Sequence, residues 1–280
     1  MAKIDKSSVP VFVLAGGLGT RISEETQLKP KPMIEIGGIP LLTHIMRSYY
    51  RHGFTDFVIC AGYRSWEIKN YFLNYEFRKN HLAIDNRLAL DSEPTSFGRC
   101  ETQEKWRVRV IDTGVDCYTG GRLARAIDLV SQDTKFEHFA VTYGDGVSSV
   151  DLTSELEFHT AHNKIGTVLS VAMQVRFGVL NIVEDGLVTG FIEKPENRQE
   201  RVSGGFFFFR KGFREYLSPD ERCILERTPL EKLTLDRQLM SFAHKGFRYP
   251  MDTLRDKNYL EELWHSGKVP WLDSASPQLN

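Results

Sequence analysis

One loop near the start of the chain combines backbone freedom with positive charge, a combination suited to binding phosphate. It follows an apolar run at residues 11–14 and supplies Gly16, Gly17, Gly19, Thr20 and Arg21, with Lys31 ten residues further on. Because glycine has no Cβ, the backbone N–H groups of such a loop stay open to a phosphate chain, and the two cations would neutralise its charge. We predict a triphosphate site here, although the glycines alone would equally fit a tight structural turn.

This loop matches neither of two common phosphate-binding motifs. A P-loop closes its glycines with Lys-Ser or Lys-Thr, whereas this loop closes with Thr20 and Arg21. The dinucleotide fingerprint requires a third glycine at the position that Ile22 occupies here. The loop therefore indicates neither a P-loop ATPase nor a dinucleotide-dependent dehydrogenase.

A second stretch could hold a metal ion. Asp145 stands between Gly144 and Gly146, directly after an apolar run at residues 139–143. At the carboxyl end of a buried strand, such a carboxylate is a hard oxygen ligand of the kind that Mg²⁺ takes together with substrate phosphates. The alternative is an aspartate that only stabilises a turn. His159 and His162 have no third ligand in sequence, and we expect both to be solvated or to cap a helix.

A third candidate lies at the predicted start of a helix at residue 119. Gly120 and Gly121 would offer backbone donors there, and Arg122 adds a cation near the positive end of the helix dipole. A solvated helix arginine is the alternative. Gly62 follows another apolar run and is a candidate contact for a base or sugar, or simply a turn glycine.

The elements that must position these residues alternate between strand and helix. Apolar runs at 11–14, 57–61 and 139–143 predict buried strands, and residues 108–112 predict a further strand. Apolar spacing predicts helices from residue 41, over 66–77 and from residue 119. This order is typical of an α/β fold with a Rossmann-like, mostly parallel central sheet flanked by helices. We expect an extension at 1–8, a single domain at 9–272 and a tail at 273–280. Within the domain we expect a nucleotide part at about 9–150, a β-ribbon or flap at 81–106 and an acceptor part at 164–255.

Composition narrows the class of protein. The 280 residues are 41% hydrophobic with a formal net charge of −1, which gives no general field for nucleic acid or an anionic membrane. The polar N-terminus is unlike a signal peptide, and no apolar run reaches the length of a membrane span. Its four cysteines form no C-x-x-C pair, so we expect a cytoplasmic protein with reduced thiols and no structural zinc.

Several blocks together resemble the sugar-1-phosphate nucleotidyltransferases over residues 9–271. They are Leu-Ala-Gly-Gly-Leu-Gly-Thr-Arg (14–21), Lys-Pro-Lys-Pro-Met-Ile-Glu (29–35), Tyr-Gly-Asp-Gly (143–146), Glu-Lys-Pro (193–195), Gly-Gly-Phe-Phe (204–207) and Pro-Met-Asp-Thr-Leu-Arg-Asp-Lys (250–257). The blocks at 21–26, 119–123, 259–264 and 267–271 are similar to the cytidylyl branch of that family. The resemblance implies Mg²⁺-dependent transfer of CMP from CTP to α-D-glucose 1-phosphate, giving CDP-glucose and pyrophosphate, in a homo-oligomer with a hexamer as the candidate state.

The resemblance, together with the residue patterns above, assigns roles to particular residues. The nucleotide-binding set is Leu14, Ala15, Gly16, Gly17, Leu18, Gly19, Thr20, Arg21, Gly62, Gly121, Arg122 and Gly144. The catalytic set is Arg21 for the leaving pyrophosphate, Lys31 for the α-phosphate and Asp145; the metal ligands are Asp145 and Asp252; and the sugar-phosphate set is Glu193, Lys194 and Gly205. In such a reaction the protein acts by positioning and by neutralising charge.

Departures from the family pattern leave the acceptor open. They are Cys117 in place of a hydroxyl residue, Gln174, Ser203, Thr228, and Arg248 where an aromatic residue is usual. A cytidylyltransferase for another acceptor phosphate and a non-catalytic sugar-nucleotide sensor are the alternatives. A metal-dependent glycosyltransferase is a third class, but the D-x-D pair typical of those enzymes is missing at Asp145-Gly146-Val147.

Overall fold

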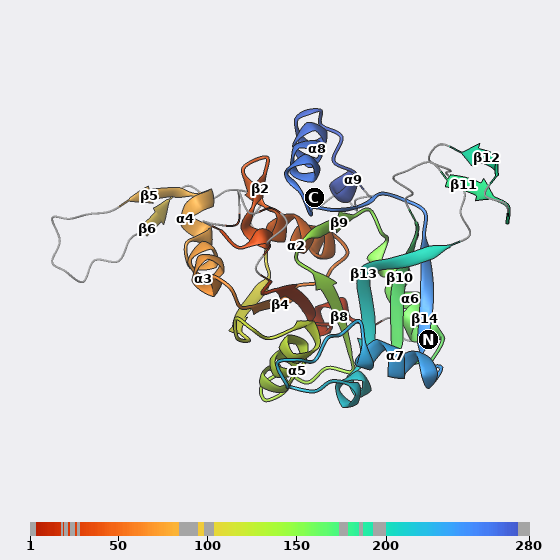
Figure 1. The fold of residues 1–280 in the computed structure, drawn as a ribbon. Coiled ribbons are helices and arrows are strands. Elements are labelled where there is room, and N and C mark those ends of the chain that lie inside the picture. Colours follow the sequence, from red (N-terminus) through yellow and green to blue (C-terminus); the bar gives the residue numbers. More distant parts are fainter. Residues whose placement is uncertain are drawn as a thin grey trace.

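The fold is built on one seven-stranded sheet (Figure 1). The computed structural model describes residues 4–17, 19, 22, 26, 29–83, 95–97, 104–173, 179–184, 187–192 and 200–273. Strand order across the sheet is β14-β10-β13-β8-β1-β4-β7. Every neighbouring pair is parallel except the two pairs that β13 makes, with β10 and with β8. The predicted mostly parallel α/β sheet is therefore confirmed, with β13 as its antiparallel member.

The sheet strands are β1 (Val11–Ala15), β4 (Asp56–Ala61), β7 (Arg107–Asp112), β8 (His138–Tyr143), β10 (Gly166–Ala172), β13 (Arg201–Arg210) and β14 (Leu239–His244). Small two-stranded sheets are formed by β2 (Glu35–Ile36) with β3 (Ile39–Pro40), β5 (His81–Ala83) with β6 (Thr95–Phe97), β9 (Gly146–Ser148) with β15 (Arg248–Pro250), and β11 (Val179–Ile182) with β12 (Val188–Ile192).

The α-helices are α2 (Leu41–Arg51), α3 (Ser65–Leu73), α4 (Tyr75–Lys79), α5 (Thr119–Val130), α6 (Leu152–Ala161), α7 (Thr228–Leu235), α8 (Leu254–His265) and α9 (Pro270–Asp273). Three short 3₁₀ helices, η1 (Lys6–Ser8), η3 (Lys31–Met33) and η4 (Lys211–Tyr216), complete the described elements.

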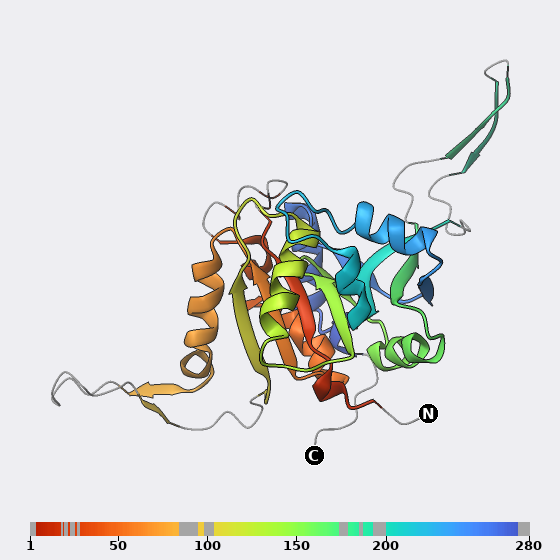
Figure 2. The same ribbon diagram turned by 90° about the horizontal axis from the view of Figure 1, so that it is seen from below.

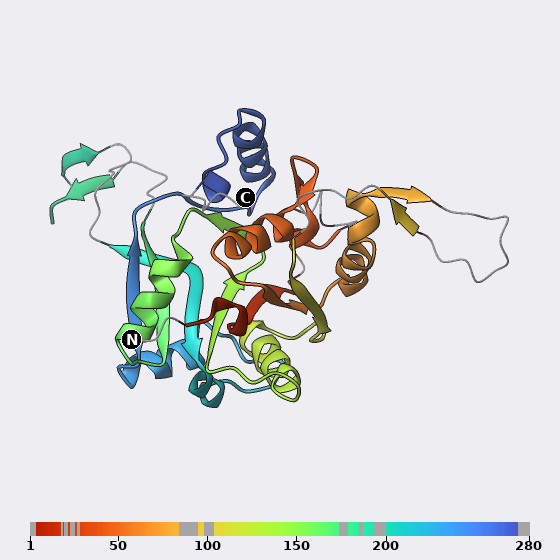
Figure 3. The same ribbon diagram turned by 180° about the vertical axis from the view of Figure 1, so that it is seen from behind.

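Each buried strand contributes side chains to both faces of the sheet. In β1, Val11 and Val13 join one apolar core, while Phe12 and Leu14 join the other, because successive residues of a strand point to opposite faces. The first core packs under α2, α3 and α6, and the second packs under α5, η4 and α7 (Figures 2 and 3). The result is a three-layer sandwich in which the strands' carboxyl ends remain open for a site.

Two two-stranded ribbons project from this body (Figure 1). The predicted ribbon within 81–106 is confirmed where β5 and β6 pair as antiparallel strands; residues 84–94 and 98–103 lie outside the described part. The second ribbon, formed by β11 and β12, lies on the other side of the molecule.

Two local expectations need correction. The helix predicted over 66–77 divides at Asn74, whose side chain donates to the carbonyl of Asn70, giving α3 and α4. His159 is fully buried rather than solvated, with its Nδ1 2.9 Å from the hydroxyl of Thr167. Among the residues that the structure describes, no helix is both long and apolar enough to span a bilayer.

Candidate active site

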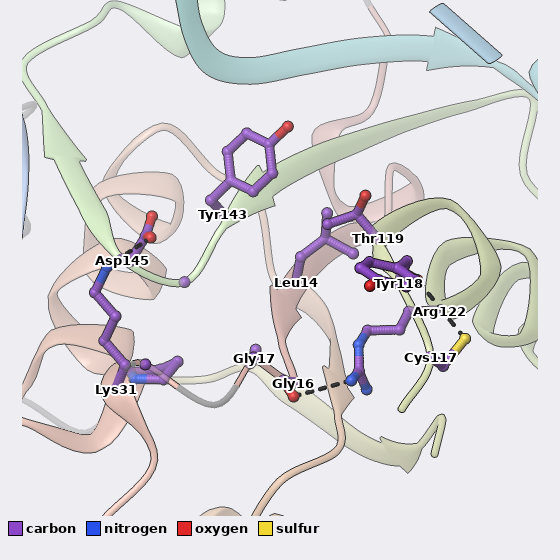
Figure 4. Close-up of a pocket in the computed structure, with 14 residues that line it drawn as sticks. Leu14, Gly16, Gly17, Lys31, Cys117, Tyr118, Thr119, Arg122, Tyr143 and Asp145 are labelled. Atoms are coloured by element: carbon purple, nitrogen blue, oxygen red, sulfur yellow. Dashed lines mark hydrogen bonds and ion pairs between the residues drawn. The ribbon is translucent and has the colours of Figure 1, made fainter. Parts of the chain in front are cut away.

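The glycine loop and the ends of β1 and β8 enclose a pocket of about 290 Å³ (Figure 4). Its described lining is Leu14, Ala15, Gly16, Gly17, Gly19, Lys31, Pro32, Cys117, Tyr118, Thr119, Arg122, Tyr143, Gly144 and Asp145. Because β1 and β8 are parallel neighbours, both predicted stretches reach the same edge of the sheet. The backbone N–H of Gly144 donates to the carbonyl of Leu14 at 2.9 Å and ties the two strand ends together.

Arg122 crosses the floor of this pocket and is held by the protein itself. Its Nη1 donates to the Ala61 carbonyl, the Thr113 hydroxyl and the Gly114 carbonyl, at 3.2, 2.9 and 2.6 Å. Its Nη2 donates to the carbonyls of Gly16 and Val115, both at 2.9 Å. Arg122 is only 4% exposed, and burial lowers the pKa of its guanidinium. The side chain therefore links the glycine loop to the end of β4 and to the segment before α5.

Two glycines make room for that guanidinium. A Cβ on Gly16 would lie 2.1 Å from Arg122 Nη1, and a Cβ on Gly62 would lie 2.2 Å from the same atom. Since real Cβ contacts are never this short, any larger residue at either position would displace the arginine. Gly16 and Gly62 thus form a cradle for Arg122, a reason for both glycines beyond a turn.

Lys31 lies between two carboxylates at the other end of the pocket. Its Nζ is 2.9 Å from Asp145 Oδ2 and 2.7 Å from Asp252 Oδ1. The lysine side chain is 10% exposed, against 34% for Asp145 and 24% for Asp252. Pro30 and Pro32 flank Lys31 in η3 and fix its backbone, which aims the side chain inward. Lys31 is therefore a buried cation of the site rather than a solvated surface residue.

The two aspartates meet because β9 and β15 pair as antiparallel strands. Asp145 immediately precedes β9 and Asp252 follows β15, and the N–H of Met251 donates to the Asp145 carbonyl at 2.8 Å. Residues 107 positions apart in the chain are thus brought to one lysine. We call Asp145 and Asp252 the acid pair.

Asp256 fixes the backbone that carries Asp252. Its carboxylate accepts hydrogen bonds from the N–H groups of Asp252 and Thr253, at 3.0 and 2.8 Å, and from the hydroxyls of Thr253 and Tyr249. Thr253 and Asp256 form a capping box at the start of α8. The Thr-x-x-Asp spacing at 253–256 was a sequence signal for this cap, but nothing in it indicated a role in placing Asp252.

A bridge of hydroxyls and a carboxylate crosses the pocket mouth. Thr119 Oγ1 donates to Glu226 Oε2 at 2.8 Å, and the Tyr143 hydroxyl donates to Glu226 Oε1. Burial and the nearby Glu226 carboxylate raise the pKa of Tyr143, so its hydroxyl stays protonated as the donor. Glu226 was not among the predicted site residues.

The remaining predicted residues fall in three places. Gly121 packs at the start of α5, where its N–H donates to the Cys223 carbonyl at 3.1 Å, so it lies behind the pocket wall. Gly205, with φ of +79°, lies in β13 where a Cβ would come within 2.6 Å of the Tyr143 ring. Outside the described residues lie Leu18, Thr20, Arg21, Glu193 and Lys194.

The acid pair suits a divalent cation. Two carboxylates from separate loops converge within hydrogen-bond distance of one ammonium, so their oxygens already lie close together around a positive charge. Hard carboxylate oxygens in pairs, completed by substrate phosphate, are the donor set that Mg²⁺ prefers. The described part of the chain holds no cluster of three or more His, Cys, Asp or Glu that could bind a metal alone. A cation at the acid pair could complete its coordination with water and with the phosphate oxygens of a substrate.

Comparison with known proteins places this chain in a family. The family model for nucleotidyl transferases matches residues 11–253. The chain is 44% identical over 263 residues to "Glucose-1-phosphate cytidylyltransferase" of Salmonella typhi, covering 92% of this chain and 97% of that one. It is 35% identical over 259 residues to "Probable glucose-1-phosphate cytidylyltransferase" of Bacillus subtilis, with the same two coverages. The structure of HddC from Yersinia pseudotuberculosis, 21% identical, superposes with a TM-score of 0.61 over 91% of this chain and 99% of that one, which supports the fold.

Proposed function

The chain belongs to the nucleotidyl transferase family, and on that premise we propose that it transfers CMP from CTP to α-D-glucose 1-phosphate, releasing pyrophosphate and forming CDP-glucose. Relatives bearing that activity in their names match nearly the whole chain, at 44% and 35% identity. The observation that carries the proposal is the placement of Lys31 between the acid pair at the end of a pocket lined by a glycine loop.

The chemistry asks for charge neutralisation rather than covalent catalysis. The acceptor's phosphate oxygen must attack the α-phosphorus of CTP while pyrophosphate leaves, so two polyanions must be held in line. In our proposal the glycine loop binds the triphosphate through its backbone N–H groups, and Lys31 neutralises charge on the α-phosphate. Arg21 is assigned to the leaving pyrophosphate, and Lys194 with Glu193 to the phosphate and hydroxyls of the acceptor; these three remain predictions from resemblance.

We further propose that Mg²⁺ is the metal and that Asp145 and Asp252 hold it. When bound, the ion would supply positive charge to the phosphate oxygens that complete its coordination. Around it, Asp256 fixes the backbone of Asp252, and the pairing of β9 with β15 fixes Asp145. The protein's own contribution is thus a preset pair of oxygen ligands beside a buried ammonium.

Arg122 has a supporting role in this proposal. All five of its hydrogen bonds go to protein oxygens, one of them the carbonyl of Gly16 in the loop. We propose that Arg122 holds the glycine loop in its binding shape, in addition to the nucleotide contact that the resemblance implies. The cytoplasmic location, expected from the cysteine pattern, and the homo-oligomer, with a hexamer as the candidate state implied by the resemblance, also stay as proposals.

Pyrophosphate release tests the proposal directly. We would cross CTP, UTP, dTTP and ATP with a panel of sugar phosphates led by glucose 1-phosphate, in the presence of Mg²⁺. Release with CTP and glucose 1-phosphate alone is the expected result. Release with CTP and another acceptor would keep the mechanism and change the substrate, whereas no release with any pair would favour the sugar-nucleotide sensor. Transfer from CDP-glucose to an alcohol acceptor would indicate a glycosyltransferase.

A further inference from the structure

Arg248 lies beside the acid pair, and its two Nη groups make no hydrogen bond to the described residues. Its Nε donates to the carbonyl of Gly204 at 3.0 Å. Neither of its Nη groups has a hydrogen-bond partner among the described residues, and neither is sealed from solvent. This is the reverse of Arg122, whose two Nη groups make five hydrogen bonds to the protein. A guanidinium fork held at one end and open at the other is suited to a bidentate contact with an anion.

The surroundings of Arg248 place that fork at the substrate side of the site. A Cβ on Gly205 would lie 3.5 Å from Arg248 Nη2, and a Cβ on Gly146 would lie 3.9 Å from it. Burial lowers the pKa of the Arg248 guanidinium, while the charges of Asp145 and Asp252 act in the opposite direction. The Nη groups of Arg248 therefore lie near Gly146 of β9, Gly205 of β13 and the acid pair.

Arg248 is not the counter-ion of the acid pair. Lys31 already contacts both carboxylates, at 2.9 and 2.7 Å, and Arg248 forms no direct ion pair with any described residue. The carboxylates of the acid pair and the cations of Lys31 and Arg248 together carry no net charge before a ligand binds. A dianionic phosphate approaching from the β13 side would thus meet a partly buried cation whose hydrogen-bond donors are still open.

We propose that Arg248 binds the phosphate group of the acceptor sugar 1-phosphate and sets the enzyme's affinity for it. This inference rests on the proposed function and goes beyond it by naming an acceptor-binding residue. β15 holds the arginine in place, because Arg248 pairs with Ser148 of β9 in the same ribbon that brings Asp145 and Asp252 together. The metal ligands and the phosphate anchor are therefore parts of one rigid unit, which would align the attacking oxygen with the reacting centre.

Steady-state kinetics of three variants test this role. R248Q should raise KM for glucose 1-phosphate about 10- to 100-fold, the loss expected for hydrogen bonds from a charged donor, with KM for CTP within about twofold. R248K should lie between R248Q and wild type, because an ammonium keeps the charge and loses the fork. K245Q removes the same charge from an exposed residue in the connection between β14 and β15 and should leave both KM values unchanged.

The outcomes separate this inference from the proposed function. If wild type releases no pyrophosphate from CTP and glucose 1-phosphate, the proposed function fails. If wild type is active and R248Q leaves KM for glucose 1-phosphate unchanged, or raises KM for CTP equally, the role of Arg248 is wrong. A shift only in the Mg²⁺ concentration for half-maximal rate would assign Arg248 to the acid pair and also overturn it. Thermal unfolding of each variant, together with the R248K result, distinguishes lost binding from lost folding.

Discussion

Replacing Arg122 with lysine should destabilise the protein even though the charge is kept. The guanidinium donates five hydrogen bonds to buried or half-buried oxygens of three separate segments. An ammonium has three donors and no planar fork, so R122K must lose at least two of these bonds. At about 1.5 kcal/mol for each hydrogen bond from a charged donor, we expect the free energy of unfolding to fall by about 3 kcal/mol.

The same change should weaken nucleotide binding. The carbonyl of Gly16 would lose its hydrogen bond from Nη2 and would keep only the longer one from the N–H of Tyr63, at 3.3 Å, among the described residues. Because the glycine loop is then less firmly held, part of the binding free energy of CTP must be used to order it. KM for CTP should therefore rise together with the loss of stability.

Urea unfolding followed by tryptophan fluorescence measures the first effect, and pyrophosphate release at varied CTP measures the second. R125K is the matched control, since Arg125 lies on the same helix with a side chain that is 33% exposed. It donates two hydrogen bonds, to the carbonyls of Pro219 and Thr113, and forms an ion pair with Glu221 at 3.6 Å. R125K should change stability by less than about 1 kcal/mol. If R122K unfolds within about 1 kcal/mol of wild type while KM for CTP rises, Arg122 acts as a ligand contact and the reasoning is refuted.

Three further changes probe the rest of the site. K31M should lower kcat by about 10²- to 10³-fold, because a preorganised cation is lost. The same change removes the ammonium from between Asp145 and Asp252, so Mn²⁺ should bind the substrate-free protein more tightly, as measured by electron paramagnetic resonance. Weaker Mn²⁺ binding would contradict the position of Lys31 between the two carboxylates. D256N should lower the free energy of unfolding by about 2 kcal/mol and raise the Mg²⁺ concentration needed for half-maximal rate, because the backbone of Asp252 loses its anchor; an unchanged Mg²⁺ requirement would refute this. Burial lowers the pKa of His159 to about 2 in the folded protein. Below about pH 6.5 the unfolded chain therefore binds a proton at this histidine and the folded chain does not, so the free energy of unfolding decreases as the pH is lowered. Between pH 7.5 and 5, H159N should therefore lose about 2 kcal/mol less than wild type in urea unfolding, and equal losses would exclude this origin.

Much of the sheet could be predicted because buried parallel strands are continuous apolar runs that end at glycine or a polar turn. This signal located β1, β4 and β8 to within a residue or two, whereas β7 was located from a segment in which apolar and charged residues are mixed. It carried no direction, however, so the antiparallel course of β13 could not be read from its four phenylalanines. Nor did the apolar spacing over 66–77 reveal the break at Asn74, which depends on a local side-chain bond to Asn70.

The candidate site was predictable in its parts and not in its connections. The glycine loop, Lys31 and Asp145 could be predicted because glycine next to charged residues is itself a local signal for binding phosphate or a metal ion. The meeting of Asp252 with Asp145 depends on the pairing of β9 with β15, two strands of three residues each with no periodic signal. The five acceptors of Arg122 are mostly backbone carbonyls, which every residue has, so no sequence pattern could mark them.

The two arginines suggest how one scaffold can change its acceptor while keeping its nucleotide. Arg122 is bound into the first half of the chain by contacts at the ends of β1, β4 and β7, and any change there would disturb the glycine loop itself. Arg248 is held by one bond to Gly204, so its replacement disturbs little besides what its open Nη groups bind. Substitutions on the acceptor side should therefore alter specificity at a small cost in stability, whereas substitutions around Arg122 should be costly. Four of the five departures from the family pattern, Gln174, Ser203, Thr228 and Arg248, lie in the second half of the chain, where this difference predicts that change is tolerated. Cys117, which lines the nucleotide end of the pocket, is the exception.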